Sequence, residues 1–335
     1  MSRLDAATLL PQKTRDQAQR HLHNHGAALK KYRKQISQAY RQEILRLRMD
    51  FVTAPLQAHA EPLFNILEDY LLWMEWCSWC SLHLAPPLGL TTTQDARRMA
   101  AAMVIYCGPR LLDDAIDSHM NYKKLHPTAL DGLLRLFPDR PREMIHSQLC
   151  LIGNWLILQG INRLTRHSST ANAQATLRLC RSIAPGAILE GLHLRPLNWT
   201  EYGEIVRRKS VRYDQILYRN LLTPIAAREK ERLLNVAAHL STLAQYLNDF
   251  RDKREDEHHG RDNLITWFPG EDAFHTLCQN QIHACLDAIE SLPTATSDAL
   301  AAALVETIEA AARIPDQTTP DDHAKPIAGE SHHDR

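Results

Sequence analysis

Apolar residues recur at spacings of three and four positions along most of this chain of 335 residues. The runs from Ala100 to Leu112 and from Leu233 to Ala244 are two examples. This spacing places the apolar side chains on one face of an α-helix. No stretch shows the alternation, bounded by glycine-rich turns, that is typical of β-strands. Since 44% of the residues are hydrophobic, the chain can bury a substantial core. We therefore predict an all-α fold of one large domain or two small ones.

A short acidic stretch, Asp113-Asp114-Ala115-Ile116-Asp117, closes the first of these apolar runs. In a helix, Asp113 and Asp117 lie one turn apart on the same face, with Asp114 beside them. Three ionised carboxylates at this spacing repel one another unless a cation is bound. Mg²⁺ is commonly held by one or two carboxylates together with substrate phosphates. A solvated helix end is the alternative interpretation of this stretch on its own.

A second acidic stretch closes the run from Leu233 to Ala244. An amide and two carboxylates recur there at four-residue spacing, on one helix face: Asn248, Asp252 and Asp256. Asp249 and Glu255 flank this face, while Arg251 and Lys253 offer the alternative of ion pairs within the helix. Two acidic clusters, each ending an apolar helix, favour a pair of facing metal-binding helices.

With these motifs the sequence resembles the superfamily of trans-isoprenyl diphosphate synthases and class I terpene synthases, the polyprenyl synthetase-like proteins. The family carries a basic pair with Pro-Thr after the first motif, a Tyr…Lys-Thr segment that reaches the diphosphate, and Gly-Lys…Asp-Leu after the second. The matching segments here are Lys123-Lys124-Leu125-His126-Pro127-Thr128, Thr200-Glu201-Tyr202 with Arg207-Arg208-Lys209-Ser210, and Gly260-Arg261-Asp262-Asn263-Leu264. The resemblance implies an isoprenoid synthase-type helical bundle around a deep central pocket, with the two Asp-rich motifs facing each other.

The resemblance also implies a site that binds a prenyl diphosphate and Mg²⁺, three ions in the family. The metal ligands would be Asp113, Asp114 and Asp117 from one side and Asn248, Asp249, Asp252 and Asp256 from the other. Charge-assisted donors to the diphosphate oxygens would be Lys123, Lys124, Lys209, Arg254 and Arg261. In this chemistry the leaving group departs when bound cations and basic side chains neutralise it, and an allylic carbocation remains.

Positions just before the first motif set the depth of the pocket in chain-elongating relatives. Small Gly108 and helix-bending Pro109 would therefore shape its floor, together with Ile105 and Tyr106. We expect a Phe at position 108 to shorten the accepted prenyl chain. Aromatic rings stabilise cations, so Trp76 is a candidate lining residue, although ordinary core packing is the alternative.

One departure from the family concerns the second substrate of elongating synthases. Their Gly-Lys-x-x-Arg segment, which binds isopentenyl diphosphate, has no counterpart in the region from Tyr70 to Cys80. We therefore expect a terpene synthase, in which ionisation of a linear allylic prenyl diphosphate is followed by cyclisation or elimination. A chain-elongating prenyltransferase is the alternative. Head-to-head condensation of the squalene and phytoene type is a lesser one, because the second motif fits but the Tyr…Val-Ala-Gly-x-Val-Gly helix is absent. A catalytically silent partner subunit is a further alternative, which the intact acidic motifs oppose.

We expect three parts along the chain: a basic helical extension (1–50), a class I isoprenoid synthase domain (51–314) and a disordered tail (315–335). Residues 1–50 contain eleven Lys and Arg against four Asp and Glu, but too few aromatic residues for single-stranded nucleic acid. No apolar signal region or membrane span occurs, and the odd number of seven Cys fits a reducing compartment, so we expect a cytoplasmic protein. A homodimer is implied only by the resemblance.

Overall fold

The computed structural model describes residues 9–75, 80–116, 121–122, 126–191, 199–259 and 271–312. The helices run in the order α2 (Gln12–Phe51), η1 (Ala54–Leu56), α3 (Gln57–Trp73), η3 (Cys80–Leu84), α4 (Thr93–Ile116), α5 (Ala129–Leu136), α6 (Arg142–His167), α7 (Thr170–Gly191), α8 (Trp199–Val206), η4 (Arg207–Val211), α9 (Arg212–Leu221), α10 (Ala227–His259), α11 (Glu271–Glu290) and α12 (Thr294–Ala312). Two short strands, β1 (Asn121–Tyr122) and β2 (His126–Pro127), pair antiparallel between α4 and α5. The prediction of an all-α fold is confirmed.

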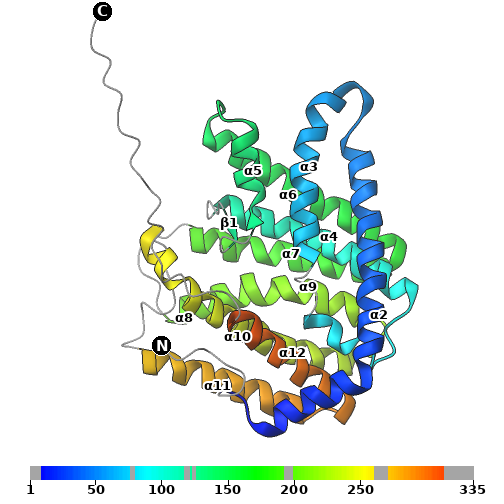
Figure 1. Cartoon of the computed structure of the whole chain (residues 1–335), viewed down its shortest axis with the longest axis vertical. Coiled ribbons are helices and arrows are strands. Elements are labelled where there is room, and N and C mark those ends of the chain that lie inside the picture. Colours follow the sequence, from blue (N-terminus) through cyan, green and yellow to red (C-terminus); the bar gives the residue numbers. More distant parts are fainter. Residues whose placement is uncertain are drawn as a thin grey trace, which may run out of the picture.

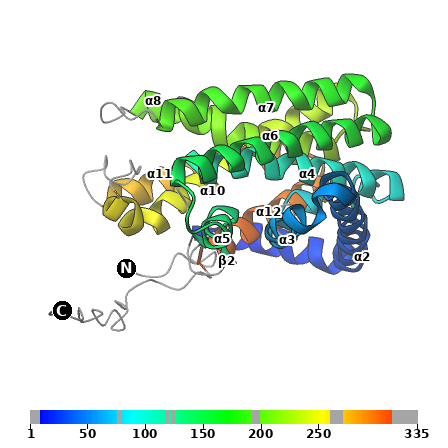
Figure 2. The same ribbon diagram turned by 90° about the horizontal axis from the view of Figure 1, so that it is seen from above.

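The helices form a bundle in which α4 is central (Figures 1 and 2). Helices α6 and α7 lie side by side along one face, α2 and α3 lie on the opposite face, and α4 runs between them. Helix α9 also packs against α4 and continues the contact toward α10. Almost every residue of α4 from Met99 to Leu111 is buried, as expected for a helix that is apolar on all sides.

Glycines allow α4 and α6 to cross closely. A Cβ at Gly108 of α4 would lie 2.5 Å from Ile157 Cγ1 and 2.6 Å from the carbonyl oxygen of Gly153. A Cβ at Gly160 of α6 would lie 2.5 Å from Ile105 Cγ1. Neither position has room for a side chain, so small residues bring the two backbones together here.

Helix α2, which covers most of the predicted basic helical extension over residues 1–50, packs against the other helices of the bundle. Its buried stripe follows the three- and four-residue spacing of a helix face: Leu29, Tyr32, Ile36, Tyr40, Ile44 and Leu47. This stripe packs against α4 and α12. The hydroxyl of Tyr40 donates to the carbonyl oxygen of Leu71 at 3.0 Å and lies 3.3 Å from Cys107 Sγ. Lys30, Lys31 and Lys34 are exposed on the other face.

None of the described helices is both long and apolar enough to cross a membrane. The expected tail over residues 315–335 lies outside the described residues.

Candidate functional site

The C-terminal end of α4 places the first acidic motif within reach of basic side chains. Lys209 Nζ lies 2.6 Å from Asp113 Oδ1, and Arg110 donates from Nη1 to Asp113 Oδ2 at 3.2 Å. Asp114 is fully buried, and its Oδ1 lies 3.6 Å from Arg110 Nε. Asp113 is therefore the more accessible of these two predicted metal ligands. Asp117 lies outside the described residues.

The second acidic motif begins on α10 with Gln245, Asn248 and Asp249, all partly buried. The hydroxyl of Tyr202 on α8 donates a hydrogen bond to Asp249 Oδ2, and Gln245 Nε2 donates to Asp249 Oδ1 at 2.7 Å. The carboxylate of Asp249 is thus oriented by donors from two helices. The side chains of three further predicted residues on this helix lie outside the described part: Asp252, Arg254 and Asp256.

A single segment, α8 followed by the π-helical turn η4, contacts both the end of α4 and the second half of α10. Lys209 pairs with Asp113 of α4, while the neighbouring Ser210 donates from Oγ to Gln245 Oε1 of α10 at 2.7 Å. Tyr202 on α8 also binds α10, as described above. A π-helical turn widens the helix locally, and such turns are frequent at functional sites. One short segment thus contacts both helices, while the facing of the two acidic motifs stays a prediction.

Helix α7 supports this segment from behind. A Cβ at Gly186 would lie 3.0 Å from Arg208 Cβ and 3.1 Å from the backbone nitrogen of Lys209. Glycine at this position therefore lets α7 approach the backbone of η4 closely.

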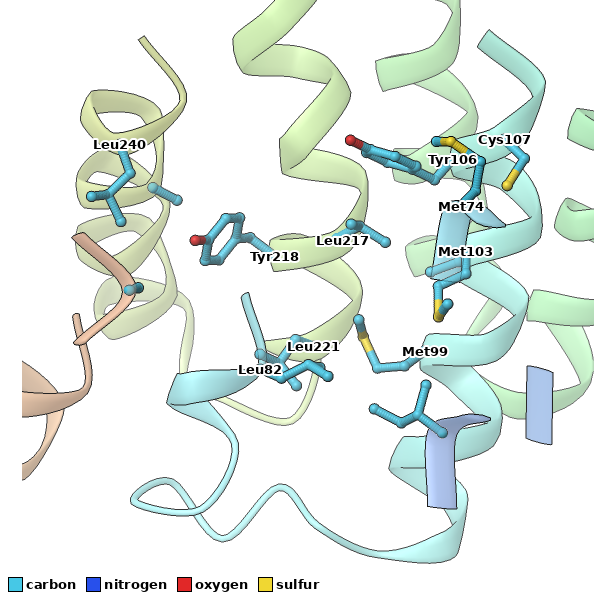
Figure 3. Packing of buried hydrophobic residues seen from close by; sticks show 14 of the residues in the cluster. Met74, Leu82, Met99, Met103, Tyr106, Cys107, Leu217, Tyr218, Leu221 and Leu240 are labelled. Carbon is cyan, nitrogen blue, oxygen red and sulfur yellow. The ribbon is translucent and has the colours of Figure 1, made fainter. Parts of the chain in front are cut away.

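A polar group lies on the inner side of α9, beneath the acidic ends. The ring centroids of Tyr106 and Tyr213 are 3.9 Å apart, and the Tyr106 hydroxyl donates to Asp214 Oδ1 at 3.4 Å. Figure 3 shows α9 between α4 and α10, with the Tyr106 side chain directed from α4 toward α9. Burial raises the pKa of Asp214 to about 6, although the hydroxyls of Ser241 and Tyr106 and the charge of Arg110 oppose the shift.

The residues expected to line a pocket separate into two groups. Tyr106 faces α9 and the polar group just described, whereas Ile105 and Gly108 face α6. Gly108 therefore takes part in helix packing, while its role as a lining residue stays a prediction. Pro109 is buried beside it within α4, which continues to Ile116. Trp76 lies outside the described residues.

Oxygen atoms at the two helix ends are of the kind that Mg²⁺ prefers. Asp113, Asn248 and Asp249 supply carboxylate and amide oxygens, so the donor chemistry fits this ion. No group of three His, Cys, Asp or Glu side chains is arranged to hold a metal within the described ranges. The predicted ligands Asp117, Asp252 and Asp256 have side chains outside those ranges, as do the diphosphate candidates Lys123, Lys124 and Arg261.

A cavity of about 350 Å³ lies at another place, where the beginning of α2 meets α11. Leu10, Ile282, His283 and Leu286 are among its lining residues, and none of the lining residues belongs to the acidic helix ends. The motifs predict that three segments surround the site, and all three lie outside the described residues: 76–79, 117–120 and 260–270. The deep pocket between the acidic ends therefore stays a prediction.

No protein-family profile matches this sequence, and no curated protein sequence is significantly similar to it. Solved structures, however, match over most of their length. A geranyltransferase from Legionella pneumophila has a TM-score of 0.60 and 15% identity, over 85% of this chain and 97% of that one. A geranylgeranyl pyrophosphate synthetase from the archaeon Geoglobus acetivorans has a TM-score of 0.59 and 17% identity, over 84% and 98%.

A third similar structure is a geranylgeranyl pyrophosphate synthase from Corynebacterium glutamicum, which was solved with isoprenyl diphosphate and magnesium. Its TM-score is 0.58 and its identity 13%, over 84% of this chain and 99% of that one. At these identities the likeness concerns the fold. The resemblance that the motifs indicate is confirmed at this level, and the chain has the fold of the trans-isoprenyl diphosphate synthases.

Proposed function

We propose that this protein is an Mg²⁺-dependent enzyme that ionises an allylic prenyl diphosphate between the ends of α4 and α10. The observation that carries the proposal is the double attachment of η4. Lys209 lies 2.6 Å from Asp113 of α4, while Ser210 binds Gln245 of α10 at 2.7 Å. A cation beside a carboxylate of α4, on a segment that also binds α10, supports a site at which a diphosphate would depart.

Each candidate site residue has a defined part in the proposed reaction. Asp113, Asn248 and Asp249 would hold Mg²⁺, together with Asp117, Asp252 and Asp256. The bound ions would supply positive charge that stabilises the departing diphosphate. Lys209 and Arg110, which lie within 3.2 Å of Asp113 oxygens, are the described cations nearest to that position, and Lys209 would turn toward the diphosphate oxygens. Lys123, Lys124, Arg254 and Arg261 are proposed to contact the same group.

We favour prenyl transfer as the reaction that follows ionisation. The solved structures that share this fold carry the names of geranyltransferases and geranylgeranyl diphosphate synthases, which support transfer to an acceptor rather than the terpene synthase reaction. A terpene synthase remains the second candidate on one specific observation. No Lys or Arg occurs between Arg48 and Arg97, so this part of the chain offers no basic side chain to a second diphosphate.

Product analysis distinguishes these reactions. The full chain is incubated with Mg²⁺ and geranyl, farnesyl or geranylgeranyl diphosphate, with and without isopentenyl diphosphate. Longer prenyl diphosphates that form only with isopentenyl diphosphate would support transfer. Hydrocarbon or alcohol products formed without it would support the terpene synthase. Absence of diphosphate release from every substrate would contradict the proposal and favour a silent partner subunit.

We further propose that two copies of the chain associate through α6. Met144, Leu151 and Leu158 follow at seven-residue spacing on one helix face and are 44%, 64% and 64% exposed. Light scattering should give twice the chain mass of 38.2 kDa, and the double substitution Leu151→Glu with Leu158→Glu should give the single-chain mass. Leu45→Glu, at an exposed apolar position on α2, is the control and should leave the mass unchanged. A wild-type protein of single-chain mass would contradict the pairing.

A further inference from the structure

The outer face of α2 carries exposed basic side chains that have no part in the proposed site. Between Asp16 and Glu43 this helix contains no acidic residue and six basic ones: Arg20, Lys30, Lys31, Arg33, Lys34 and Arg41. Four of the six are exposed, at positions 30, 31, 34 and 41, and we refer to these four as the basic stripe. The whole chain has 39 Lys and Arg and 39 Asp and Glu, so this charge is concentrated locally.

Carboxylates that lie beside α2 are already paired with other cations. Glu306 of α12 lies 3.3 Å from Arg33. Glu61 and Glu68 of α3 lie 3.2 and 2.5 Å from Arg48. Within the described residues, no carboxylate forms an ion pair with a member of the basic stripe. The positive charge of the stripe is therefore available to a partner outside the chain.

Two exposed apolar side chains continue the basic stripe toward the end of α2. With 3.6 residues per turn, positions 30, 31, 34, 41, 45 and 49 fall within an arc of about 100° and span about 28 Å of helix. Leu45 and Met49 are 48% and 77% exposed. In Figures 1 and 2, α2 lies at the edge of the bundle. Basic and apolar side chains thus share one outward face.

An anionic membrane surface offers both kinds of contact. Each Lys or Arg near an anionic leaflet strengthens binding by about fivefold, and apolar side chains enter the boundary between headgroups and acyl chains. Single-stranded nucleic acid also offers phosphates, but proteins that bind it stack its bases on exposed aromatic rings. Tyr32 and Tyr40 of α2 are both 0% exposed, so their rings belong to the core. A second copy of the chain would bring like charges together.

We propose that the basic stripe, together with Leu45 and Met49, binds the protein peripherally to anionic phospholipid membranes. Helix α2 keeps its place in the bundle, because its buried side packs against α4 and α12, and its outer face meets the lipid headgroups. The proposal goes beyond the proposed function and does not depend on it. Together, the two would bring the enzyme to the surface into which the apolar chains of prenyl compounds partition.

Flotation with phospholipid vesicles tests the proposal on the full chain in the absence of substrate. We expect binding to vesicles of phosphatidylcholine mixed with phosphatidylglycerol, and binding weaker by about 100-fold or more to phosphatidylcholine alone. Binding should also weaken as salt is raised from about 0.1 to about 1 M, because the Debye length falls from about 10 to about 3 Å. Equal binding to both kinds of vesicle, or binding to neither, would overturn the proposal.

A triple substitution locates the contact on α2. Combined Lys30→Gln, Lys31→Gln and Lys34→Gln should weaken binding to the anionic vesicles by about 100-fold, since three of the four charges are lost. The melting temperature should not change, because these side chains are exposed. The matched control removes three exposed charges from α6 and α7 on the opposite face and should bind as the wild type does: Arg166→Gln, Arg178→Gln and Arg181→Gln. An equal loss in both variants would overturn the assignment to α2.

A further variant tests the apolar part of this face. Leu45→Ser with Met49→Ser should weaken binding by about tenfold at both salt concentrations, because contact with the acyl boundary is lost. Tighter binding of the wild type to single-stranded RNA than to the anionic vesicles would overturn the choice of a membrane as partner. Diphosphate release is measured separately, and its absence would overturn the proposed function while leaving vesicle binding as expected here.

Discussion

Replacement of Asp113 by Asn is expected to lower the rate of diphosphate release from an allylic prenyl diphosphate by about 10³-fold. Asp113 is the less deeply buried of the two described carboxylates at the end of α4 and the partner of Lys209. The amide keeps the shape of the side chain but removes the negative charge that attracts a divalent cation. The rate of release is measured against Mg²⁺ concentration, and the concentration needed for half-maximal rate should rise.

A second variant separates the two partners of this ion pair. Lys209→Met should also slow diphosphate release, by about 100-fold, because one cation near the leaving group is lost. In the absence of substrate, however, it should bind Mg²⁺ more tightly than the wild-type protein, since Lys209 no longer competes for Asp113. Asp139→Asn, at an exposed position between α5 and α6, is the control. Undiminished turnover in Asp113→Asn would remove this residue from the site.

Gly108→Phe is expected to destabilise the protein by more than about 3 kcal/mol, the second large effect. A Cβ at this position already lies 2.5 Å from Ile157 Cγ1 and 2.6 Å from a backbone oxygen of α6. The ring can be accommodated only if α4 and α6 move apart along their whole contact. Gly108→Ala should lower the free energy of unfolding by about 1–3 kcal/mol for the same reason. Urea denaturation measures both.

Gly26→Ala on α2 is the matched control for this series. Nothing lies within 4 Å of a Cβ built at Gly26, so the intrinsic helix propensity of Ala should stabilise the protein, by about 1 kcal/mol. The sequence alone suggested a different outcome for Gly108→Phe, namely a stable enzyme that accepts shorter prenyl chains. That outcome would show that Gly108 lines a substrate pocket, and it would contradict the expected loss of stability.

The fold follows from the sequence to the extent that helical periodicity defines it. The apolar runs from Ala100 to Leu112 and from Leu233 to Ala244 lie within α4 (Thr93–Ile116) and α10 (Ala227–His259), as the helical spacing predicts. The apolar stripe of α2 was not predicted, because the basic residues of its charged face dominate the composition of the first fifty residues. Membership of the core depends on what covers that stripe, and no local pattern contains this information.

The site was predictable in its residue types and only partly in its contacts. The Tyr…Lys-Thr resemblance identified Tyr202 and Lys209, but their partners Asp249 and Asp113 depend on how three helices cross. The direction of Gly108 depends on the rotation of α4 against α6, and one residue changes that direction by 100°. Asp214, a single carboxylate on the side of α9 that also carries the buried Leu217 and Tyr218, was not singled out from the sequence.

The most direct test of the central claim is a crystal structure of the full chain with Mg²⁺ and an unreactive thio-analogue of farnesyl diphosphate. The account predicts that the diphosphate group lies between the end of α4 and the acidic stretch of α10. Metal ions should contact Asp113 and the acidic residues of α10, Lys209 should contact a diphosphate oxygen, and the prenyl chain should extend toward Tyr106. An analogue bound elsewhere, or carboxylates of α4 and α10 that share no ion-binding space, would contradict it.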